Sequence, residues 1–255
     1  MMLSVVIPCY NEEKTIISVL DAVNRSGFDT DIIVVDDGST DSTVKLLQNY
    51  KGPSVRIVAQ PKNRGKGAAL RVGFDMAVGD IVLVQDADLE YSPEDYPILL
   101  KPILSGRADA VYGSRFQGGP GRVLYYFHML GNKCLTTLSN IFTGLNLTDM
   151  ETCYKVFRRE IIQSLNLRSN RFGIEPEITA KIARIPKIRI YEVPIQYHGR
   201  TYLEGKKVTW KDGIAAVAFI LIYSWEARFG RAYRQDTQSI IEVRDVNYNW
   251  TQRQL

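Results

Sequence analysis

Residues 1–113 alternate short apolar runs with helix-like segments, and this alternation limits the possible folds more than any other feature of the chain. Five runs have the length and composition of buried strands, at residues 3–8, 31–36, 55–59, 81–85 and 110–113. Between them, apolar side chains recur at helical spacing in residues 16–23, 66–78 and 93–104. Strands that alternate with helices favour a parallel sheet covered on both faces. We therefore predict an α/β fold with a Rossmann-like, mostly parallel sheet and helices on both faces.

Polar side chains follow three of these predicted strands at the point where each strand ends. Tyr10 and Glu12 come after the first run, Asp37 comes after the second, and Asp86 and Asp88 come after the fourth. In open parallel sheets, ligands bind beyond the carboxyl ends of the strands. The sequence therefore predicts that these residues meet in one binding site.

Two carboxylates in this group, Asp86 and Asp88, are one residue apart. Both can reach a single divalent cation, and carboxylate oxygens suit Mg²⁺ or Mn²⁺. Glu90, two residues further along, is a candidate third metal ligand. A bound cation would neutralise a diphosphate leaving group. An aspartate-rich turn without a metal would show the same local pattern. The metal site is favoured because Asp86 and Asp88 follow four alternating strand–helix units.

Two further segments have a binding interpretation and a purely structural one. Asp37 can bind ribose hydroxyls or a base edge, but turn formation and helix capping also explain the residues around it. In the segment 63–67, glycines allow close backbone approach and Lys66 can meet a phosphate. A glycine turn before a helix explains that segment equally well, and the P-loop pattern is absent.

Taken together and in order, these segments resemble family 2 glycosyltransferases of the GT-A fold. More narrowly, they resemble the polyprenyl-phosphate branch of that family, the dolichol-phosphate mannose synthase-like enzymes. The resemblance is carried by residues 8–12, 35–39, 65–67 and 86–90, and it extends through residues 113–115, 149–157, 172–178 and 193–201. It covers residues 2–225, nearly the whole chain.

The resemblance implies roles for particular residues. The implied nucleotide-sugar site consists of Pro8, Tyr10, Glu12, Asp37, Lys66, Asp86, Ala87 and Asp88. Asp86, Asp88 and Glu90 match the metal-binding segment, with Asp88 the more direct ligand. Arg115 and Arg200 match arginines expected near the donor diphosphate and the acceptor phosphate, so Asp88, Arg115 and Arg200 are the implied catalytic residues. Without the resemblance, surface salt bridges would be the simpler interpretation of the two arginines.

Charge is unevenly distributed along the chain. Residues 1–100 carry 15 acidic and 9 basic side chains, whereas residues 101–211 carry 18 basic and 8 acidic ones, within a net charge of +4. We interpret the acidic part as serving the metal and nucleotide sugar, and the basic part as serving phosphate and a membrane surface. Chance scatter of solvated surface charge is the alternative.

The second half of the chain is less regular than the first. Residues 155–165 and 177–184 read as short helices, residues 187–194 as a strand, and residues 210–229 as a helix with an apolar middle. The segments 125–144 and 210–229 suit amphipathic helices that lie on a membrane, although core or oligomer helices would show the same pattern. We predict a catalytic domain at residues 1–208 and a membrane-associating helix with a polar tail at residues 209–255.

The longest apolar run has ten residues, at 214–223, which is too short to cross a bilayer. No signal peptide is recognisable, and the three cysteines show no metal-ligand spacing. We expect a protein on the cytoplasmic face of the membrane, peripherally associated, with no nucleic-acid partner and possible assembly into a homo-oligomer.

The predicted function is inverting, metal-dependent transfer of a hexose from a nucleotide sugar, of the UDP-glucose or GDP-mannose type, to a dolichyl or undecaprenyl phosphate. A lipid phosphate is already an anion near neutral pH, so it can attack without a general base. Two alternatives remain: transfer to a sugar hydroxyl in glycan assembly, and non-catalytic binding of a nucleotide sugar. The absence of a Gln-x-x-Arg-Trp motif disfavours the first of these, and the intact acidic and arginine set disfavours the second.

Overall fold

The protein is built around one seven-stranded sheet. The computed structural model describes residues 1–53, 55–118, 121–123, 125–200, 210–230 and 232–234. The strands are β1 (Leu3–Cys9), β2 (Thr30–Asp36), β3 (Val55–Ala59), β4 (Ile81–Val84), β5 (Ala110–Ser114), β6 (Lys155–Arg158) and β7 (Ile190–Pro194). Their spatial order is β3-β2-β1-β4-β6-β5-β7. Neighbouring strands are parallel except where β6 runs antiparallel to β4 and β5. The predicted α/β fold with a mostly parallel sheet is confirmed.

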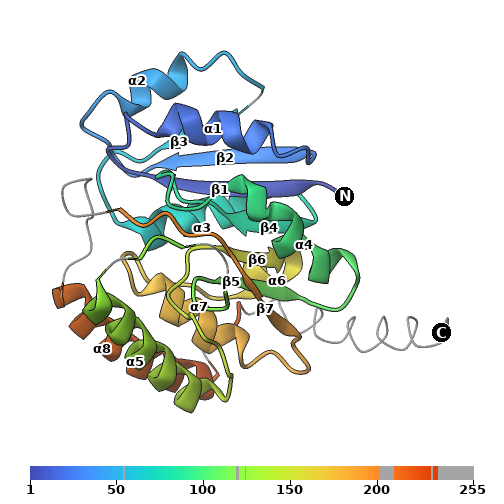
Figure 1. Cartoon of the computed structure of the whole chain (residues 1–255), viewed down its shortest axis with the longest axis vertical. Coiled ribbons are helices and arrows are strands. Elements are labelled where there is room, and N and C mark those ends of the chain that lie inside the picture. Colours follow the sequence, from blue (N-terminus) through green and yellow to red (C-terminus); the bar gives the residue numbers. More distant parts are fainter. Residues whose placement is uncertain (54, 119–120, 124, 201–209, 231, 235–255) are drawn as a thin grey trace.

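Helices cover both faces of this sheet (Figure 1). They are α1 (Ile16–Asn24), α2 (Thr43–Gln48), α3 (Lys66–Met76), α4 (Tyr96–Leu104), α5 (Tyr126–Thr143), α6 (Arg159–Ser164), α7 (Ile174–Ile182) and α8 (Trp210–Arg228), with a short 3₁₀ turn, η1, at Pro93–Asp95. In α1 the apolar residues whose spacing predicted a helix form its buried face: Ile16, Val19, Leu20 and Val23 are all buried.

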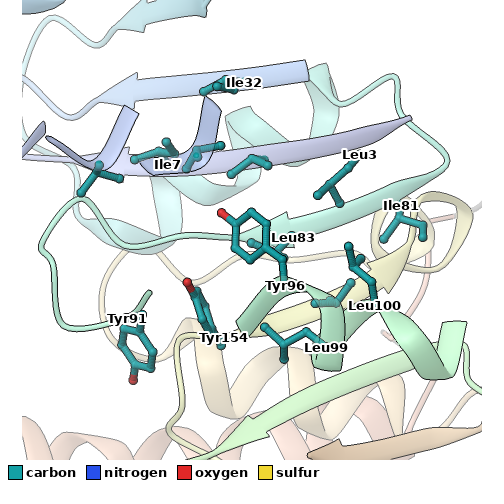
Figure 2. Packing of buried hydrophobic residues seen from close by; sticks show 14 of the residues in the cluster. Leu3, Ile7, Ile32, Ile81, Leu83, Tyr91, Tyr96, Leu99, Leu100 and Tyr154 are labelled. Carbon is teal, nitrogen blue, oxygen red and sulfur yellow. The ribbon is translucent and has the colours of Figure 1, made fainter. Parts of the chain in front are cut away.

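Side chains that alternate along the strands divide the core into two layers. Val5 and Ile7 of β1 pack with α1 and α4, whereas Val6, between them, packs with α3 on the opposite face. Figure 2 shows the first layer, in which Tyr96 and Tyr154 lie among aliphatic side chains. Both hydroxyls donate to the Gln85 side-chain oxygen, at 2.9 and 2.7 Å. This bonding satisfies polar atoms that would otherwise be costly to bury.

The register of the strands brings the predicted polar loops to one edge. Cys9, the last residue of β1, lies opposite Asp36, the last residue of β2. Val84, the last residue of β4, pairs with Val6 of β1, and the loop that contains Asp86 follows it directly in the chain. The loops that follow β1, β2 and β4 therefore leave the sheet side by side.

One predicted element is wrong in part. Residues 155–165 were expected to form a helix, but Lys155–Arg158 is strand β6 and only Arg159–Ser164 is helical. Val156 and Phe157 are fully buried on opposite faces of the sheet, in different core layers. A short apolar run that is buried on both sides carries no visible alternation of polar and apolar residues, which explains the error.

Helices α5 and α8 lie side by side at one end of the molecule (Figure 1). Ile220 of α8 joins the second core layer, and Tyr223 and Ala227 pack with Ala180 of α7. The domain boundary predicted at residues 208 and 209 lies outside the described residues, as does the part of the predicted polar tail from residue 235 on. Within the described part, no helix is both long enough and apolar enough to span a bilayer.

Candidate functional site

A cavity of about 990 Å³ opens at the carboxyl edge of the sheet. It is lined by every residue that the sequence predicted for the site, namely Pro8, Tyr10, Glu12, Asp37, Lys66, Asp86, Ala87, Asp88, Glu90, Arg115 and Arg200. Some of these residues are more than a hundred positions apart in the chain, so the fold gathers them. The roles assigned to them individually remain predictions.

Lys66, the first residue of α3, points into a group of acidic side chains. Its Nζ lies 3.0 Å from Asp86 Oδ1 and 3.2 Å from Glu175 Oε1, and it donates to Cys153 Sγ at 2.7 Å. Burial opposes the charged form of Lys66, but Asp86, Cys153 and Glu175 outweigh it and raise the lysine pKa well above its usual value. Lys66 is therefore a fixed cation beside the first aspartate of the Asp-x-Asp pair.

The second aspartate, Asp88, belongs to a cluster of three carboxylates around one guanidinium. Arg200 Nη2 lies 2.5 Å from Asp88 Oδ2, Nη1 lies 3.5 Å from Glu12 Oε2, and Nε lies 3.6 Å from Glu90 Oε1. Glu90 also accepts hydrogen bonds from the Arg200 backbone N–H and the Tyr197 hydroxyl. Burial, followed by the charges of Asp86 and Glu90, raises the pKa of Asp88 to about 7 despite Arg200. The carboxylates therefore repel one another and favour any added cation.

Arg115, at the end of β5, is held by a buried carboxylate. Its Nε and Nη2 donate to the two oxygens of Asp149, at 2.6 and 2.7 Å, and its backbone N–H donates to the same group. Asp149 is fully buried, and Arg115 is 15% exposed. The guanidinium also lies 5.1 Å from the centroid of the Tyr197 ring. This is not a surface salt bridge, the alternative interpretation of Arg115, because Arg115 lines the cavity and both side chains are largely excluded from solvent.

Asp37 holds the glycine-containing loop in place. Its two carboxylate oxygens accept the backbone N–H groups of Arg64 and Gly65, at 2.9 and 2.6 Å. Gly65 has a φ of +100°, and a side chain there would meet the Asn170 carbonyl oxygen at 2.3 Å. The glycine therefore permits a close approach of the chain's own backbone, and it orients Lys66 toward Asp86.

The acidic cluster is chemically suited to a hard divalent cation, although it is not preassembled as a metal centre. Asp86 and Asp88 supply carboxylate oxygens from one loop, and burial, followed by the charges of Asp86 and Glu90, raises the pKa of Asp88. Among the described residues, no group of three or more His, Cys, Asp or Glu side chains has the arrangement of a metal site. Lys66 and Arg200 occupy positions beside the carboxylates instead.

Several residues of the cavity wall were not assigned a role from the sequence. They are Tyr91, Glu151, Cys153, Glu175 and Tyr197. Asp149, which holds Arg115, was not assigned a role either, and it is buried behind that arginine. Asp149, Glu151 and Cys153 lie in the loop before β6, and Glu175 lies in the first turn of α7. The sequence signal for most of them was the family resemblance, which extends through residues 149–157, 172–178 and 193–201 but assigned no role to these side chains.

Comparison with known proteins gives consistent matches over most of the chain. The model of "Glycosyl transferase family 2" matches residues 4–165. A low-salt glycan biosynthesis hexosyltransferase from Haloferax volcanii is 32% identical, over 86% of this chain and 53% of its own length. A dolichyl-phosphate β-glucosyltransferase from Trichomonas vaginalis is 30% identical, over 89% of this chain and 76% of its own. An undecaprenyl-phosphate mannosyltransferase from Micrococcus luteus is 29% identical, over 86% and 92%.

Solved structures extend the comparison to the fold. Glucosyl-3-phosphoglycerate synthase from Mycobacterium tuberculosis, solved with Mn²⁺, UDP and phosphoglyceric acid, matches with a TM-score of 0.68 at 22% identity. The match covers 90% of this chain and 78% of that one, and it confirms the expected fold. The chain spans about half the length of the Haloferax relative. The family model covers well over half of the chain, and the chain belongs to glycosyl transferase family 2.

Proposed function

We propose that this protein transfers a hexose from a nucleotide sugar to a polyprenyl phosphate, with a divalent cation, Mg²⁺ or Mn²⁺, at the Asp86–Asp88 loop. One observation carries the proposal: a single cavity combines this acidic loop with two arginines, Arg115 and Arg200. The relatives named for transfer to dolichyl and undecaprenyl phosphate support the choice of acceptor.

The donor would occupy the wall formed by the β1, β2 and β4 loops. Pro8, Tyr10, Glu12 and Asp37 are proposed to surround the nucleotide, next to the cavity-lining Ala87. When bound at Asp86, Asp88 and Glu90, a divalent cation supplies a positive charge that stabilises a diphosphate leaving group. Lys66 is fixed beside Asp86 and adds a second positive charge in the same region.

The acceptor phosphate would be positioned by the arginines. A guanidinium binds phosphate through two parallel N–H donors, which fixes its orientation as well as its place. Arg115 is oriented by its ion pair with Asp149. Arg200, six residues after the end of β7, is held in the acidic cluster by its ion pair with Asp88. A phosphate monoester needs no base to attack the sugar carbon, so positioning and charge account for the catalysis.

The α5–α8 face is proposed to rest on the cytoplasmic surface of the membrane that holds the lipid. Large apolar side chains on these helices are exposed, namely Tyr126, Phe127, Leu130, Ile141 and Phe142 on α5, and Ile214, Val217, Leu221, Ile222 and Trp225 on α8. Phe127 also lines the cavity, so this face is continuous with the proposed active site. An amphipathic surface of this kind suits shallow insertion into lipid.

The donor half of the proposal is tested by thermal unfolding with a panel of nucleotide sugars. With Mn²⁺ present, UDP-glucose or GDP-mannose should raise the melting temperature, because a ligand that binds only the folded state stabilises it by mass action. The acceptor half is tested by competition between undecaprenyl phosphate in vesicles and a free oligosaccharide. If no donor stabilises the protein, or if the oligosaccharide is the preferred acceptor, the proposal is wrong.

A further inference from the structure

Glu192, on the edge strand β7, does not line the cavity, but its carboxylate accepts hydrogen bonds from several parts of the chain. The backbone N–H groups of Thr148 and Asp149 donate to its Oε1, at 2.9 and 3.0 Å. The Thr148 hydroxyl and the Gln117 side-chain amide donate to its Oε2, at 2.9 and 2.6 Å. Hydrogen bonds to a charged acceptor are stronger than those between neutral groups. Glu192 therefore fixes the loop before β6 against the edge of the sheet.

The hydroxyl of Thr148 extends this ordering to the chain on either side of Arg115. A carboxylate only accepts hydrogen bonds, so Thr148 Oγ1 uses its proton for Glu192. The 2.6 Å contact between Thr148 Oγ1 and Ser114 Oγ then takes its proton from Ser114. Ser114 Oγ in turn accepts the backbone N–H of Phe116, at 3.1 Å. The charge of Glu192 therefore sets the direction of the hydrogen bonds at both residues that flank Arg115.

The same carboxylate thus holds both members of the Arg115–Asp149 ion pair. It holds Asp149 through the backbone N–H, and it holds Arg115 through the residues on either side of it. Ser114 and Asp149 are fully buried, whereas Glu192 is only partly buried, so the network runs from the surface to the ion pair. A change at Glu192 should therefore reach the cavity through the orientation of the Arg115 guanidinium.

We propose that Glu192 is a positioning residue, which orients Arg115 through Asp149 and Ser114 and thereby sets the binding of the acceptor phosphate. This inference rests on the proposed function, in which Arg115 binds that phosphate. A guanidinium has further N–H groups beyond the two that Asp149 accepts, and their directions are fixed by the planar fork. A rotation of the fork misaligns them with the phosphate. The donor wall consists of the loops after β1, β2 and β4, so donor binding should not depend on Glu192.

Hydrogen exchange of the Arg115 Nε–H, measured by nuclear magnetic resonance on ¹⁵N-labelled protein, reports the orientation of this side chain. The group donates to Asp149 at 2.6 Å, and a hydrogen bond slows exchange with water. Glu192→Gln replaces one accepting oxygen by an N–H₂ group that faces other donors. Exchange at Arg115 should therefore become about tenfold faster, as for the loss of one hydrogen bond. The Arg56 Nε–H, which donates to Asp31 at the opposite edge of the sheet, is the internal reference and should not change.

Kinetics and calorimetry measure the consequence for each substrate. In Glu192→Gln, kcat/KM for undecaprenyl phosphate in vesicles should fall about tenfold, whereas UDP or GDP with Mn²⁺ should bind within about twofold of the wild type. Thr148→Val removes the hydroxyl of an exposed residue. It should change exchange and kcat/KM in the same direction, and it decides the matter if Glu192→Gln does not fold. Thr148→Ser keeps the hydroxyl, and Glu160→Gln removes an exposed carboxylate on α6, so both should behave like the wild type.

The outcomes distinguish the positioning role from the function on which it rests. Unchanged exchange at Arg115 in the folded variants overturns the positioning role. Faster exchange with an unchanged kcat/KM for the lipid overturns the connection to the acceptor, as does an equal loss of nucleotide binding. If the wild type makes no lipid-linked sugar from any donor, the proposed function fails, and the acceptor role of Glu192 fails with it. The exchange measurement then still decides whether Glu192 orients Arg115.

Discussion

The Arg115–Asp149 pair gives the sharpest test of how the site is held together. Asp149 is fully buried and receives three N–H groups of Arg115, two of them from the guanidinium. Asp149→Asn keeps the shape of the side chain but removes its charge, and it turns an amide N–H₂ toward a guanidinium donor. Loss of one partner from a buried ion pair costs about 3–5 kcal/mol, because the remaining charge stays buried without compensation.

We expect Asp149→Asn to lie near the lower end of that range, about 3 kcal/mol, because the amide oxygen still accepts one hydrogen bond. For a domain of this size, each kcal/mol lowers the melting temperature by about 2–4 °C, so the expected shift is about 6–12 °C. Urea unfolding followed by circular dichroism measures the free energy, and differential scanning fluorimetry measures the melting temperature.

Asp75→Asn is the matched control. Arg234 and Asp75 form an Arg–Asp contact of 2.6 Å, the same as the shortest contact of the buried pair, but the two side chains are 48% and 51% exposed. Exposed pairs contribute about 0–1 kcal/mol. The double variant Arg115→Met/Asp149→Leu should recover part of the lost stability, since it leaves no buried charge. Equal shifts for Asp75→Asn and Asp149→Asn would refute the reasoning, as would a double variant less stable than Asp149→Asn.

Three further predictions concern metal binding, pH and the membrane. Arg200→Ala removes the guanidinium that Glu12, Asp88 and Glu90 share, so sugar transfer should fall while Mn²⁺ binds several-fold more tightly. Electron paramagnetic resonance titration measures the Mn²⁺ affinity, and weaker Mn²⁺ binding would contradict the prediction. Burial, followed by the charge of Glu175, raises the pKa of Glu151 from 4.5 to about 8. Between these values the folded protein holds a proton that the unfolded chain has lost, so this group lowers stability as pH rises. The stability of Glu151→Gln relative to the wild type should therefore grow from pH 5 to pH 8, by at most about 1.4 kcal/mol per pH unit, and a flat difference in urea unfolding would count against it. The double variant Ile141→Ser/Trp225→Ser should reduce the fraction of protein that floats with anionic vesicles about tenfold or more, because both side chains are exposed on the α5–α8 face. The control Val78→Ser changes an exposed apolar residue elsewhere and should leave that fraction unchanged.

The sequence was sufficient to predict most strands of the sheet and to name many residues of the cavity. Strand–helix alternation in residues 1–113 is a local pattern, and parallel strands necessarily bring Glu12, Asp37 and Asp88 to one edge. The motif resemblance added Arg115 and Arg200, which local patterns alone would have placed in surface salt bridges. All of these side chains line one cavity.

The partners of the charged groups were not predictable, because they depend on contacts between distant parts of the chain. Arg200 meets Asp88 across 112 residues, and Lys66 contacts Cys153 across 87. The identity of β6 was missed for a related reason: Val156 and Phe157 are buried on both faces, so strand and helix look alike in the sequence. Glu151 and Glu175 lie in segments that carry the resemblance, but the lack of a hydrogen-bond partner for a buried oxygen of each, among the described residues, depends on the folded chain.

Formation of a lipid-linked sugar tests the central claim most directly. The protein is incubated with Mn²⁺, vesicles that contain undecaprenyl phosphate, and the donor that raises its melting temperature, and the lipids are analysed by mass spectrometry. The account predicts a hexosyl-phosphate lipid that disappears on addition of EDTA and is not made by Asp88→Ala, although this variant keeps the wild-type circular dichroism spectrum. A product that persists in EDTA, or an active Asp88→Ala, would contradict the metal site, and no lipid-linked sugar with any donor would contradict the function.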